Sequence, residues 1–392
     1  MLYTDYITEL LDLKEVNILK QEILDDKVIL TVEYNVKPHA CPQCGYITSL
    51  VHDYRIHTVI DIPFQNKKVI IKYNKRRYRC PCCNKRFDEN QLFAPKNCQY
   101  SSRMNYYLLT QLSSKCSIAD VAKNNLTSCN KLFRLLNEIH LSNAKALPEV
   151  LSIDEFRGNA GRKFQCILTD PVRKEIIDIL PGRESHILTA YFRGFPKSER
   201  EKVKYFVMDM NKEYLSIAKA FFPKATIIID KFHFARYNNW SLENMRKKCQ
   251  KNLLAEERKY FKKSRKLLNM RAAKLNNDGV EAVALMLKIA PDLCDGYFLK
   301  EKFYAFSDSD SFETAKQRLK EFIFHASTLN IPEYKPTITM LLNWSEYILN
   351  SFKYHYSNAY TEGMNNKIKV LKRVAFGFRN FENLRKRILL LA

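Results

Sequence analysis

Short apolar runs separated by turn residues dominate the chain from about residue 149. They predict five strands, at 149–156, 163–169, 174–180, 203–210 and 225–230. The segment 170–173 (Asp-Pro-Val-Arg) supplies a turn between the second and third of these strands. Periodic apolar positions predict helices near 185–195 and 212–222. The expected order is therefore three meandering strands, then strand, helix and strand.

The remaining segments have a helical pattern. Apolar positions spaced three and four residues apart predict helices at 103–116, 117–126 and 127–139. The segment 240–350 is also helical in pattern, with core candidates at 285–290 and 338–344. The order of elements indicates a multi-domain α/β protein with a ribonuclease-H-like mixed sheet. We interpret 240–350 as an all-helical insertion into that sheet domain.

The charge balance narrows the class of partner. The chain has 392 residues, with 65 Lys and Arg against 42 Asp and Glu, so its net charge is +23. Such an excess is better explained by binding to a polyanionic partner such as nucleic acid than by a contribution to solubility alone. A hydrophobic content of 46% excludes disorder as the main state. Because the sequence has no apolar run of about 18 residues and no signal-peptide pattern, we expect a cytoplasmic protein with no membrane partner.

Six of the 11 cysteines lie between positions 41 and 98. Cys41 and Cys44 form one Cys-x-x-Cys pair, which a glycine follows, and Cys80 and Cys83 form a second. Four thiolates from two such knuckles suit one tetrahedral, structural Zn²⁺, so we predict a zinc ribbon. Cys82 lies inside the second pair and leaves the choice of ligand there open.

The segment between and around the knuckles is strongly basic. Residues 66–87 contain nine Lys or Arg and no acid, and the parts 68–73 and 75–79 have a strand pattern. We favour contact of this surface with a DNA backbone over a solvated edge strand, where lysine is also common. The expected contacts are Lys75, Arg76, Arg77 and Arg79.

Residues 117–139 fit a helix-turn-helix. Ser117 is a suitable N-cap for the first short helix, as Thr127 or Ser128 is for the second. The turn contains no glycine, and a generic helical hairpin stays open as an alternative. In a helix-turn-helix, the second helix would present three side chains to the major groove: Asn130, Lys131 and Arg134.

Acids occupy strand positions that are usually apolar. Asp154 lies in the first strand of the sheet, and Asp209 lies at the C-terminal end of the fourth, where open α/β sheets place their chemistry. Neighbouring Glu155 is expected to point to the opposite face, so only one of the pair is expected to serve the site. Asp230 ends the fifth strand and is either a rival to Asp209 or a supporting group, and His233 just after it is a supporting candidate. Taken singly, each acid could equally be a strand-end or capping residue.

A third acid comes from the C-terminal stretch 357–373. At about 100° per residue, one helix face carries Glu362, Asn366, Lys369 and Arg373, and the opposite face is apolar. An acid beside amides and bases suits a metal next to a phosphate backbone, although a solvated polar face is the plain alternative. Three converging carboxylates would need divalent cations, and two Mg²⁺ ions about 4 Å apart can support phosphodiester cleavage.

The motifs, taken in this order, resemble the bacterial insertion-sequence transposases of the IS-L-three type over nearly the whole chain. The most specific stretch is 361–369 (TEGMNNKIK), and 377–381 (GFRNF) follows it. The resemblance implies a DDE active site formed by Asp154, Asp209 and Glu362 with two Mg²⁺ or Mn²⁺ ions. It also implies a homodimer or higher assembly on double-stranded DNA, both transposon ends and target, in the nucleoid.

The expected function is a transposase that binds terminal inverted repeats and catalyses DNA cleavage and strand transfer. Two alternatives stay open: a non-catalytic zinc-ribbon and helix-turn-helix regulator, and a structure-specific nuclease of the same fold. The expected domains are the zinc-ribbon region (1–98), the helix-turn-helix (99–145), the first part of the sheet domain (146–239), the helical insertion (240–350) and a C-terminal catalytic helix with a basic tail (351–392).

Overall fold

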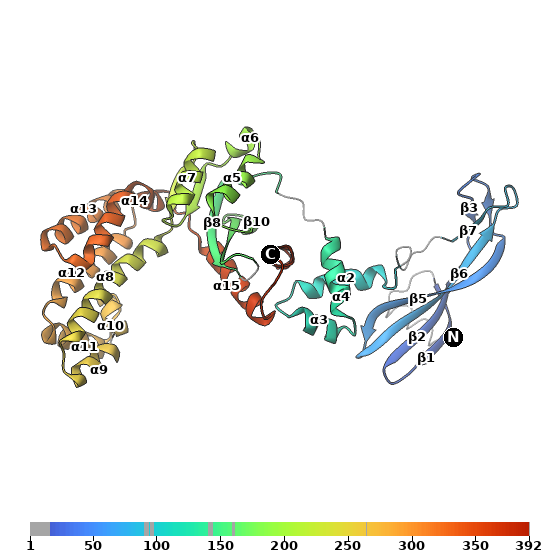
Figure 1. Cartoon of the computed structure of the whole chain (residues 1–392), viewed down its shortest axis with the longest axis horizontal. Coiled ribbons are helices and arrows are strands. Elements are labelled where there is room, and N and C mark those ends of the chain that lie inside the picture. Colours follow the sequence, from blue (N-terminus) through green and yellow to red (C-terminus); the bar gives the residue numbers. More distant parts are fainter. Residues whose placement is uncertain are drawn as a thin grey trace. The chain divides into compact units, whose positions relative to one another are not determined.

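The chain forms a mixed α/β structure with two compact units. The computed structural model describes residues 16–89, 94, 98–139, 144–158, 161–263 and 265–391. The first unit comprises residues 1–141 together with 370–391, and the second comprises 142–369. Figure 1 shows the elements of both, and each unit has its own sheet.

The sheet of the first unit is built on a long hairpin. β5 (Val51–Phe64) and β6 (Lys67–Arg79) pair in antiparallel fashion, so the two strands expected at 68–73 and 75–79 are one. The turn residues Gln65 and Asn66 both have positive φ, as a two-residue type I′ turn requires. Three further strands belong to this sheet: β1 (Val16–Ile23), β2 (Lys27–Tyr34) and β7 (Arg86–Asp88). A separate two-stranded sheet is formed by β3 (His39–Ala40) and β4 (Ile47–Thr48).

Three short helices follow this sheet: α2 (Ser102–Leu112), α3 (Ile118–Asn124) and α4 (Cys129–Glu138). Each begins after a serine whose side chain accepts a hydrogen bond from the backbone N–H three residues later; the three serines are Ser101, Ser117 and Ser128. The turn after α3 does contain a left-handed residue, but it is Leu126 (φ 50°) rather than glycine. The apolar faces of the helices meet in one core.

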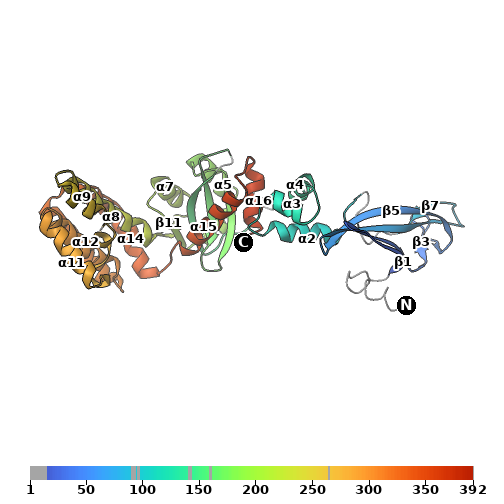
Figure 2. The ribbon, with the colours of Figure 1, turned by 90° about the horizontal axis from the view of Figure 1, so that it is seen from below.

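The C-terminal helix α16 (Phe381–Leu389) belongs to the same unit and packs against α4 (Figure 2). Arg387 is fully buried, and its guanidinium donates to the carbonyls of Ser114 (3.1 Å) and Cys116 (2.9 Å). Lys386 donates to the carbonyl of Leu136 at 2.7 Å. Segments that are far apart in the sequence therefore complete one helical core.

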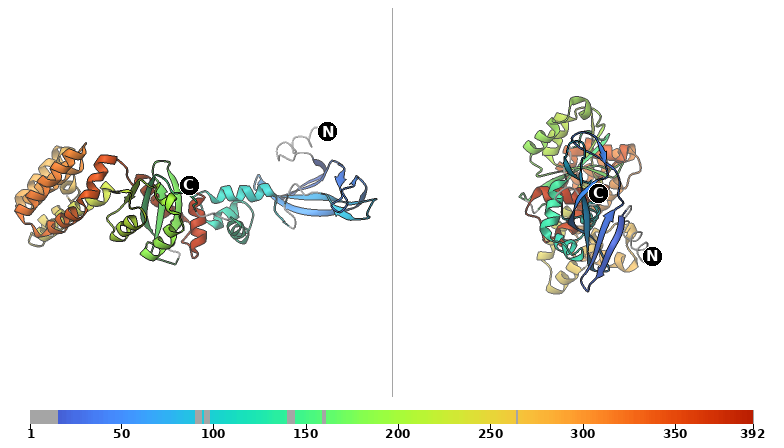
Figure 3. Two further views of the ribbon diagram at one scale, coloured as in Figure 1. Left: turned by 90° about the horizontal axis from the view of Figure 1, so that it is seen from above. Right: turned by 90° about the vertical axis from the view of Figure 1, so that its right-hand side faces the viewer.

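The second unit contains a five-stranded sheet, drawn in shades of green in Figure 3. Its strand order is β10-β9-β8-β11-β12. The strands are β8 (Val150–Arg157), β9 (Phe164–Asp170), β10 (Glu175–Leu180), β11 (Tyr205–Met208) and β12 (Thr226–Ile229). The first three form an antiparallel meander, and β11 runs parallel to both β8 and β12. Three helices lie between β10 and β12: α5 (Ser185–Arg193), α6 (Lys197–Arg200) and α7 (Lys212–Phe221).

Between β12 and α15 (Ala359–Val374), which begins in this unit, the chain is helical. The α-helices are α8 (Lys231–Lys251), α9 (Ala255–Lys263), α10 (Arg265–Asn269), α11 (Asn277–Ile289), α12 (Leu293–Ser307), α13 (Phe312–Leu329) and α14 (Lys335–Tyr354). Their core includes Met286 and Leu341, whereas the neighbouring Leu285 and Leu342 are exposed. No helix in the described part of the chain is long and apolar enough to cross a membrane.

Candidate active site and cysteine cluster

The register of the sheet brings three aspartates to one level. Asp154 lies two residues beyond Ser152, which pairs with Val207, and Asp209 lies two residues beyond Val207. β12 pairs with β11 up to the last residue of both strands, so Asp230, the next residue, is level with Asp209. Because carboxyl ends of neighbouring parallel strands meet at one edge, the three side chains start from adjacent positions.

These aspartates line one cavity of about 300 Å³, together with Glu362 of α15 and His233 of α8. The other lining residues are Glu155, Phe156, Arg157, Arg236, Asn358, Asn365 and Lys369. The structure thus brings together the four acids Asp154, Asp209, Asp230 and Glu362, which were singled out in the sequence. His233 and Lys369, also singled out there, lie in the same cavity. Asn366 and Arg373, expected on the same helix face as Glu362, are exposed and lie outside the cavity lining.

Burial makes ionisation of two of these carboxylates unfavourable. Asp154 is only 8% exposed, and desolvation raises its pKa to about 6. Desolvation also raises the pKa of Asp209, whose Oδ1 is buried without a hydrogen-bond partner among the described residues. The charge of His233 acts to lower the pKa of both carboxyls. Repulsion from Asp209 raises the pKa of Asp154 further.

Asn365 is a contact that the sequence analysis missed. Its Nδ2 donates to Oδ2 of Asp154 at 2.8 Å, and the other oxygen of Asp154 accepts from the backbone N–H of Glu155 at 2.7 Å. The Oδ1 of Asn365 is buried without a partner among the described residues. Asn365 follows Glu362 by three positions, and this helical spacing was the signal that could have identified it.

Glu155 also lines the cavity, which corrects the expectation that only one member of the Asp154–Glu155 pair could do so. The cavity lies where β8 ends, so side chains from both faces reach it. The Oε2 of Glu155 accepts from Arg183 at 2.5 Å, and the Arg183 guanidinium lies 4.5 Å from the ring centre of Phe164. This ion pair balances the charge of one of the acids in the cavity.

Buried hydroxyl groups fix the first turn of α15 against the sheet. Ser152 donates to Oδ1 of Asn358 at 2.5 Å and lies 2.9 Å from the hydroxyl of Thr361. Thr361 also lies 2.7 Å from the hydroxyl of Thr169 on β9. Since Glu362 follows Thr361 directly, this network determines where its backbone is held.

The four cysteines of the two predicted knuckles come together in the first unit. The sulfurs of Cys41, Cys44, Cys80 and Cys83 all lie within 4.8 Å of one another, with Cys41–Cys83 and Cys44–Cys80 at 3.5 Å. Cys82 is exposed and outside this group, which resolves the choice of ligand. Four such thiols fit a tetrahedral structural Zn²⁺. Over the described ranges no other three His, Cys, Asp or Glu side chains meet the same spacing, so the carboxylates of the cavity are further apart.

The two knuckles have the same backbone geometry. The N–H of Gly45 donates to the carbonyl of Cys41, and the N–H of Asn84 donates to that of Cys80. Both donors have positive φ, 73° for Gly45 and 56° for Asn84, so an asparagine performs the role of the glycine in the second knuckle. Burial acts to raise the pKa of Cys41, but backbone N–H groups of the first knuckle lower it overall to about 7.

Arg76 is a structural residue and not the exposed contact that the sequence analysis expected. It is 2% exposed, its guanidinium donates to the carbonyl of Tyr34 at 2.6 Å, and it pairs with Glu33 (3.3 Å) and Glu89 (3.7 Å). Burial in the sheet therefore removes it from any surface that could contact DNA.

Two of the other three basic residues of β6 that were expected to contact DNA form ion pairs within the sheet. Lys75 pairs with Asp88 and Arg77 pairs with Asp53, while Arg79 at the end of the strand is exposed. On α4, the side chains of Asn130 and Arg134 are exposed. Lys131 lies 4.7 Å from the ring centre of Tyr100, and burial lowers its pKa.

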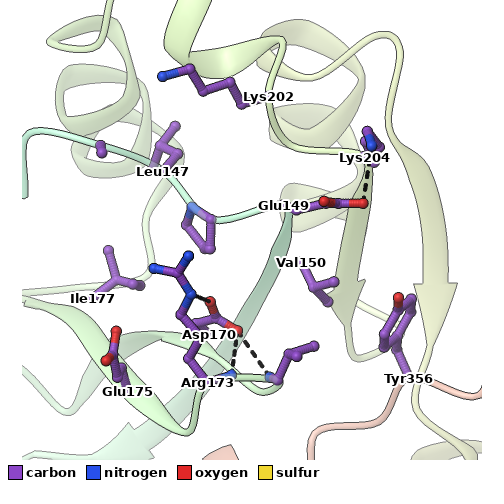
Figure 4. Close-up of a pocket in the computed structure, with 13 residues that line it drawn as sticks. Leu147, Glu149, Val150, Asp170, Arg173, Glu175, Ile177, Lys202, Lys204 and Tyr356 are labelled. Atoms are coloured by element: carbon purple, nitrogen blue, oxygen red, sulfur yellow. Dashed lines mark hydrogen bonds and ion pairs between the residues drawn. The ribbon is translucent and has the colours of Figure 1, made fainter.

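A larger cavity of about 810 Å³ lies where β8 begins, at the other end of the sheet from the aspartates (Figure 4). Figure 4 shows Glu149 paired with Lys204 and Asp170 bonded to the turn that follows it. These acids are held by neighbouring groups of the chain. The aspartate cavity is therefore the better candidate for chemistry.

Comparison with known proteins adds a second line of evidence. The model of the DDE transposases of the ISL3 (IS-L-three) type, described as "Transposase", matches residues 151–388. A zinc-finger model of the transposases IS204, IS1001, IS1096 and IS1165 matches residues 37–83. The transposase for insertion sequence element IS1001 of Bordetella parapertussis is 25% identical over 373 residues, covering 90% of this chain and 89% of that protein. A Lactococcus lactis protein named "ATP-dependent protease" is 33% identical over 158 residues, 39% of this chain and 44% of that protein.

Proposed function

The chain belongs to the DDE transposases of the ISL3 type, and on that premise we propose that it cuts DNA at the ends of an insertion sequence and joins the freed 3′ ends to target DNA. In this proposal Asp154, Asp209 and Glu362 hold two catalytic Mg²⁺ or Mn²⁺ ions. The observation that carries it is the shared cavity, to which neighbouring parallel strands contribute two of the acids and α15 the third.

The residues of the cavity fit a hard divalent cation. The unpaired Oδ1 of Asp209 would become a ligand of the cation, whose charge would offset the desolvation that raises the pKa of Asp154. Carboxylate oxygens are the donors that Mg²⁺ and Mn²⁺ prefer. When bound, such ions activate a water or 3′-hydroxyl and stabilise the leaving oxygen of a phosphodiester.

The protein groups around the acids position them and the DNA. Asn365 orients the carboxylate of Asp154. Arg236 and Lys369 line the cavity and are proposed to bind phosphate oxygens of the cleaved strand. Asp230 and His233 are proposed as supporting groups for the metal site or for a water molecule.

We propose a ribonuclease-H-like fold for the sheet of the second unit. Its support is the antiparallel meander β10-β9-β8 followed by the parallel strands β11 and β12. The helices α8 to α14 then form an insertion between β12 and α15. This division explains why Asp209 and Glu362 are far apart in the sequence.

The first unit is proposed to recognise the transposon ends. Its α3 and α4 would act as a helix-turn-helix, with Asn130, Lys131 and Arg134 facing the major groove. Of the four basic side chains expected to contact DNA from the sheet, Arg79 is exposed, and Lys75 and Arg77 would exchange their partners Asp88 and Asp53 for phosphates. We expect a homodimer or higher assembly to hold two ends together.

A cleavage assay tests the proposed chemistry. Labelled duplex DNA from the flanks of the gene is incubated with Mg²⁺ or Mn²⁺ and either wild type, Asp154→Asn, Asp209→Asn or Glu362→Gln. Metal-dependent cuts at the element boundary should be lost, by at least about 10³-fold, in all three variants, since each removes a charged ligand. Glu149→Gln, at the opposite end of the sheet, is the matched control and should cut normally.

Other outcomes would contradict the proposal in distinct ways. Specific binding of the ends without cutting favours the regulator. Cutting of branched DNA with indifference to the ends favours a structure-specific nuclease. Cutting that survives Asp209→Asn but not Asp230→Asn would assign the second acid to the neighbouring strand.

A further inference from the structure

The turn between α15 and α16 exposes a single aromatic side chain. Phe376 is 95% exposed, more than any other large hydrophobic residue in the described part of the chain. Its backbone is left-handed, with φ 52°. A bulky non-glycine residue in this conformation is an outlier that costs free energy. The protein thus accepts both an exposed apolar ring and a strained backbone at one position.

The hydrogen bonds around Phe376 identify the position as a helix C-cap that normally favours glycine. The N–H of Gly377 donates to the carbonyl of Lys372 (2.9 Å), and the N–H of Phe376 donates to that of Arg373 (3.2 Å). These two bonds define a Schellman motif with Phe376 at its left-handed residue. Gly377 follows and also has a positive φ, of 94°, so the turn contains two residues with positive φ and the first of them is a phenylalanine rather than a glycine.

The surroundings of the ring are cationic. Arg373 precedes it by three positions and Arg379 follows it by three, and both side chains are exposed. In the described part of the structure neither has a carboxylate partner within salt-bridge distance. An exposed apolar ring with an exposed arginine three positions before it and another three positions after it matches a polyanion with flat apolar faces, which is the chemistry of nucleic acid.

We propose that Phe376 is a wedge that inserts between stacked bases of the bound DNA, while Arg373 and Arg379 bind the adjacent phosphates. The proposal rests on the DNA-binding function proposed above and names a contact within it. Insertion of an apolar side chain unstacks a base step and bends the duplex. A wedge must be exposed and rigid before DNA arrives, and a capped turn that projects the ring meets both requirements.

Because the backbone at Phe376 is strained, one substitution distinguishes a role in DNA binding from a role in stabilising the fold. Phe376→Gly removes the ring and relieves the left-handed residue at the same time. The variant should bind flank duplex about tenfold more weakly and bend it less, measured by fluorescence anisotropy and by energy transfer between labelled DNA ends. Its melting temperature should nevertheless equal that of wild type or exceed it by about 2 °C.

Two further variants complete the design. Phe376→Tyr keeps an aromatic ring and should retain most of the affinity and bend. Phe324→Ala removes another exposed phenylalanine, from α13, and is the matched control that should leave DNA binding unchanged.

Each contrary result has one meaning. Unchanged affinity and bend in Phe376→Gly, with normal wild-type binding, overturns the wedge alone. A lower melting temperature in Phe376→Gly overturns it in favour of a structural role. Loss of self-association in this variant, with its intrinsic DNA affinity unchanged, overturns it in favour of a contact with a second copy of the chain. Absence of DNA binding by the wild type overturns the proposed function and the wedge with it.

Discussion

Asp154 has an environment that favours its neutral form. It is buried, and its pKa of about 6 lies above the ordinary value of 3.8. The native state therefore holds a proton between these pH values that the unfolded chain has released. Because the native state binds more protons, the free energy of unfolding falls as the pH rises from about 4 to about 6, and it stays lower above that range.

Asp154→Asn should remove this dependence. The experiment is denaturant unfolding in Mg²⁺-free buffer that retains zinc. At pH 7 the free energy of unfolding of the second unit should be lower for wild type than for the variant, by about 3 kcal/mol. At pH 4 the difference should shrink. The buried amide would keep its partners if Asn365 turns its unpaired Oδ1 toward the new Nδ2. Equal stability of the two proteins at pH 7 would contradict the burial argument, and Glu149→Gln serves as the control acid.

Single residues show where the sequence was informative and where it was not. The positions of Asp154 and Asp209 could be predicted because an acid within an apolar strand is unusual. The burial of Arg76 could not, since its partners Glu33 and Glu89 lie on other segments that only pairing brings close. The same limit applies to Asn365, whose neighbour Asn366 has the same chemistry but points elsewhere.

At the scale of elements, α16 depends on one buried cation. Arg387 lies in the core of the first unit, donates to two carbonyls beyond the end of α2, and burial lowers its pKa to about 10. Arg387→Ala should lower the free energy of unfolding of this unit by about 2–4 kcal/mol, because it leaves those carbonyls unpaired and opens a cavity. Chemical denaturation monitored by circular dichroism measures the change.

The exposed Arg379→Ala is the matched control for this experiment and should cost at most about 0.5 kcal/mol. If Arg387→Ala lowered the free energy of unfolding by equally little, the packing of α16 would not contribute to the stability of the unit.

The elements of the second unit were more predictable than those of the first. Its buried strands are apolar runs, so β8 to β12 lie within a few residues of their expected bounds. The strands β1, β2 and β5 were not predicted, although the alternating apolar residues Tyr54, Ile56, Ile60 and Ile62 of β5 are a strand signal that could have identified it. Strand order and register also could not be predicted, because the partner of a strand is determined by tertiary packing.

At the scale of the whole molecule, the division into two units predicts two unfolding transitions. A zinc chelator, or Cys41→Ser combined with Cys44→Ser, should shift one transition to lower temperature by about 10 °C or more. The reason is that thiolate ligation of structural zinc contributes directly to folding. The transition of the second unit, identified by its response to Asp154→Asn, should move by less than about 2 °C. Differential scanning calorimetry would contradict the division if both transitions moved together.

The packing of α16 on α4 has a consequence for how the protein is made. The contact between Lys386 and Leu136 joins residues 250 positions apart. At translation speeds of about 5–20 residues per second, the ribosome needs roughly 10–50 seconds to synthesise the intervening chain. During that time α2, α3 and α4 have emerged without the helix that buries their common core. A nascent chain therefore completes its first unit only after Asp154, Asp209 and Glu362 have been synthesised, and a translation product that is interrupted before α16 lacks a complete first unit.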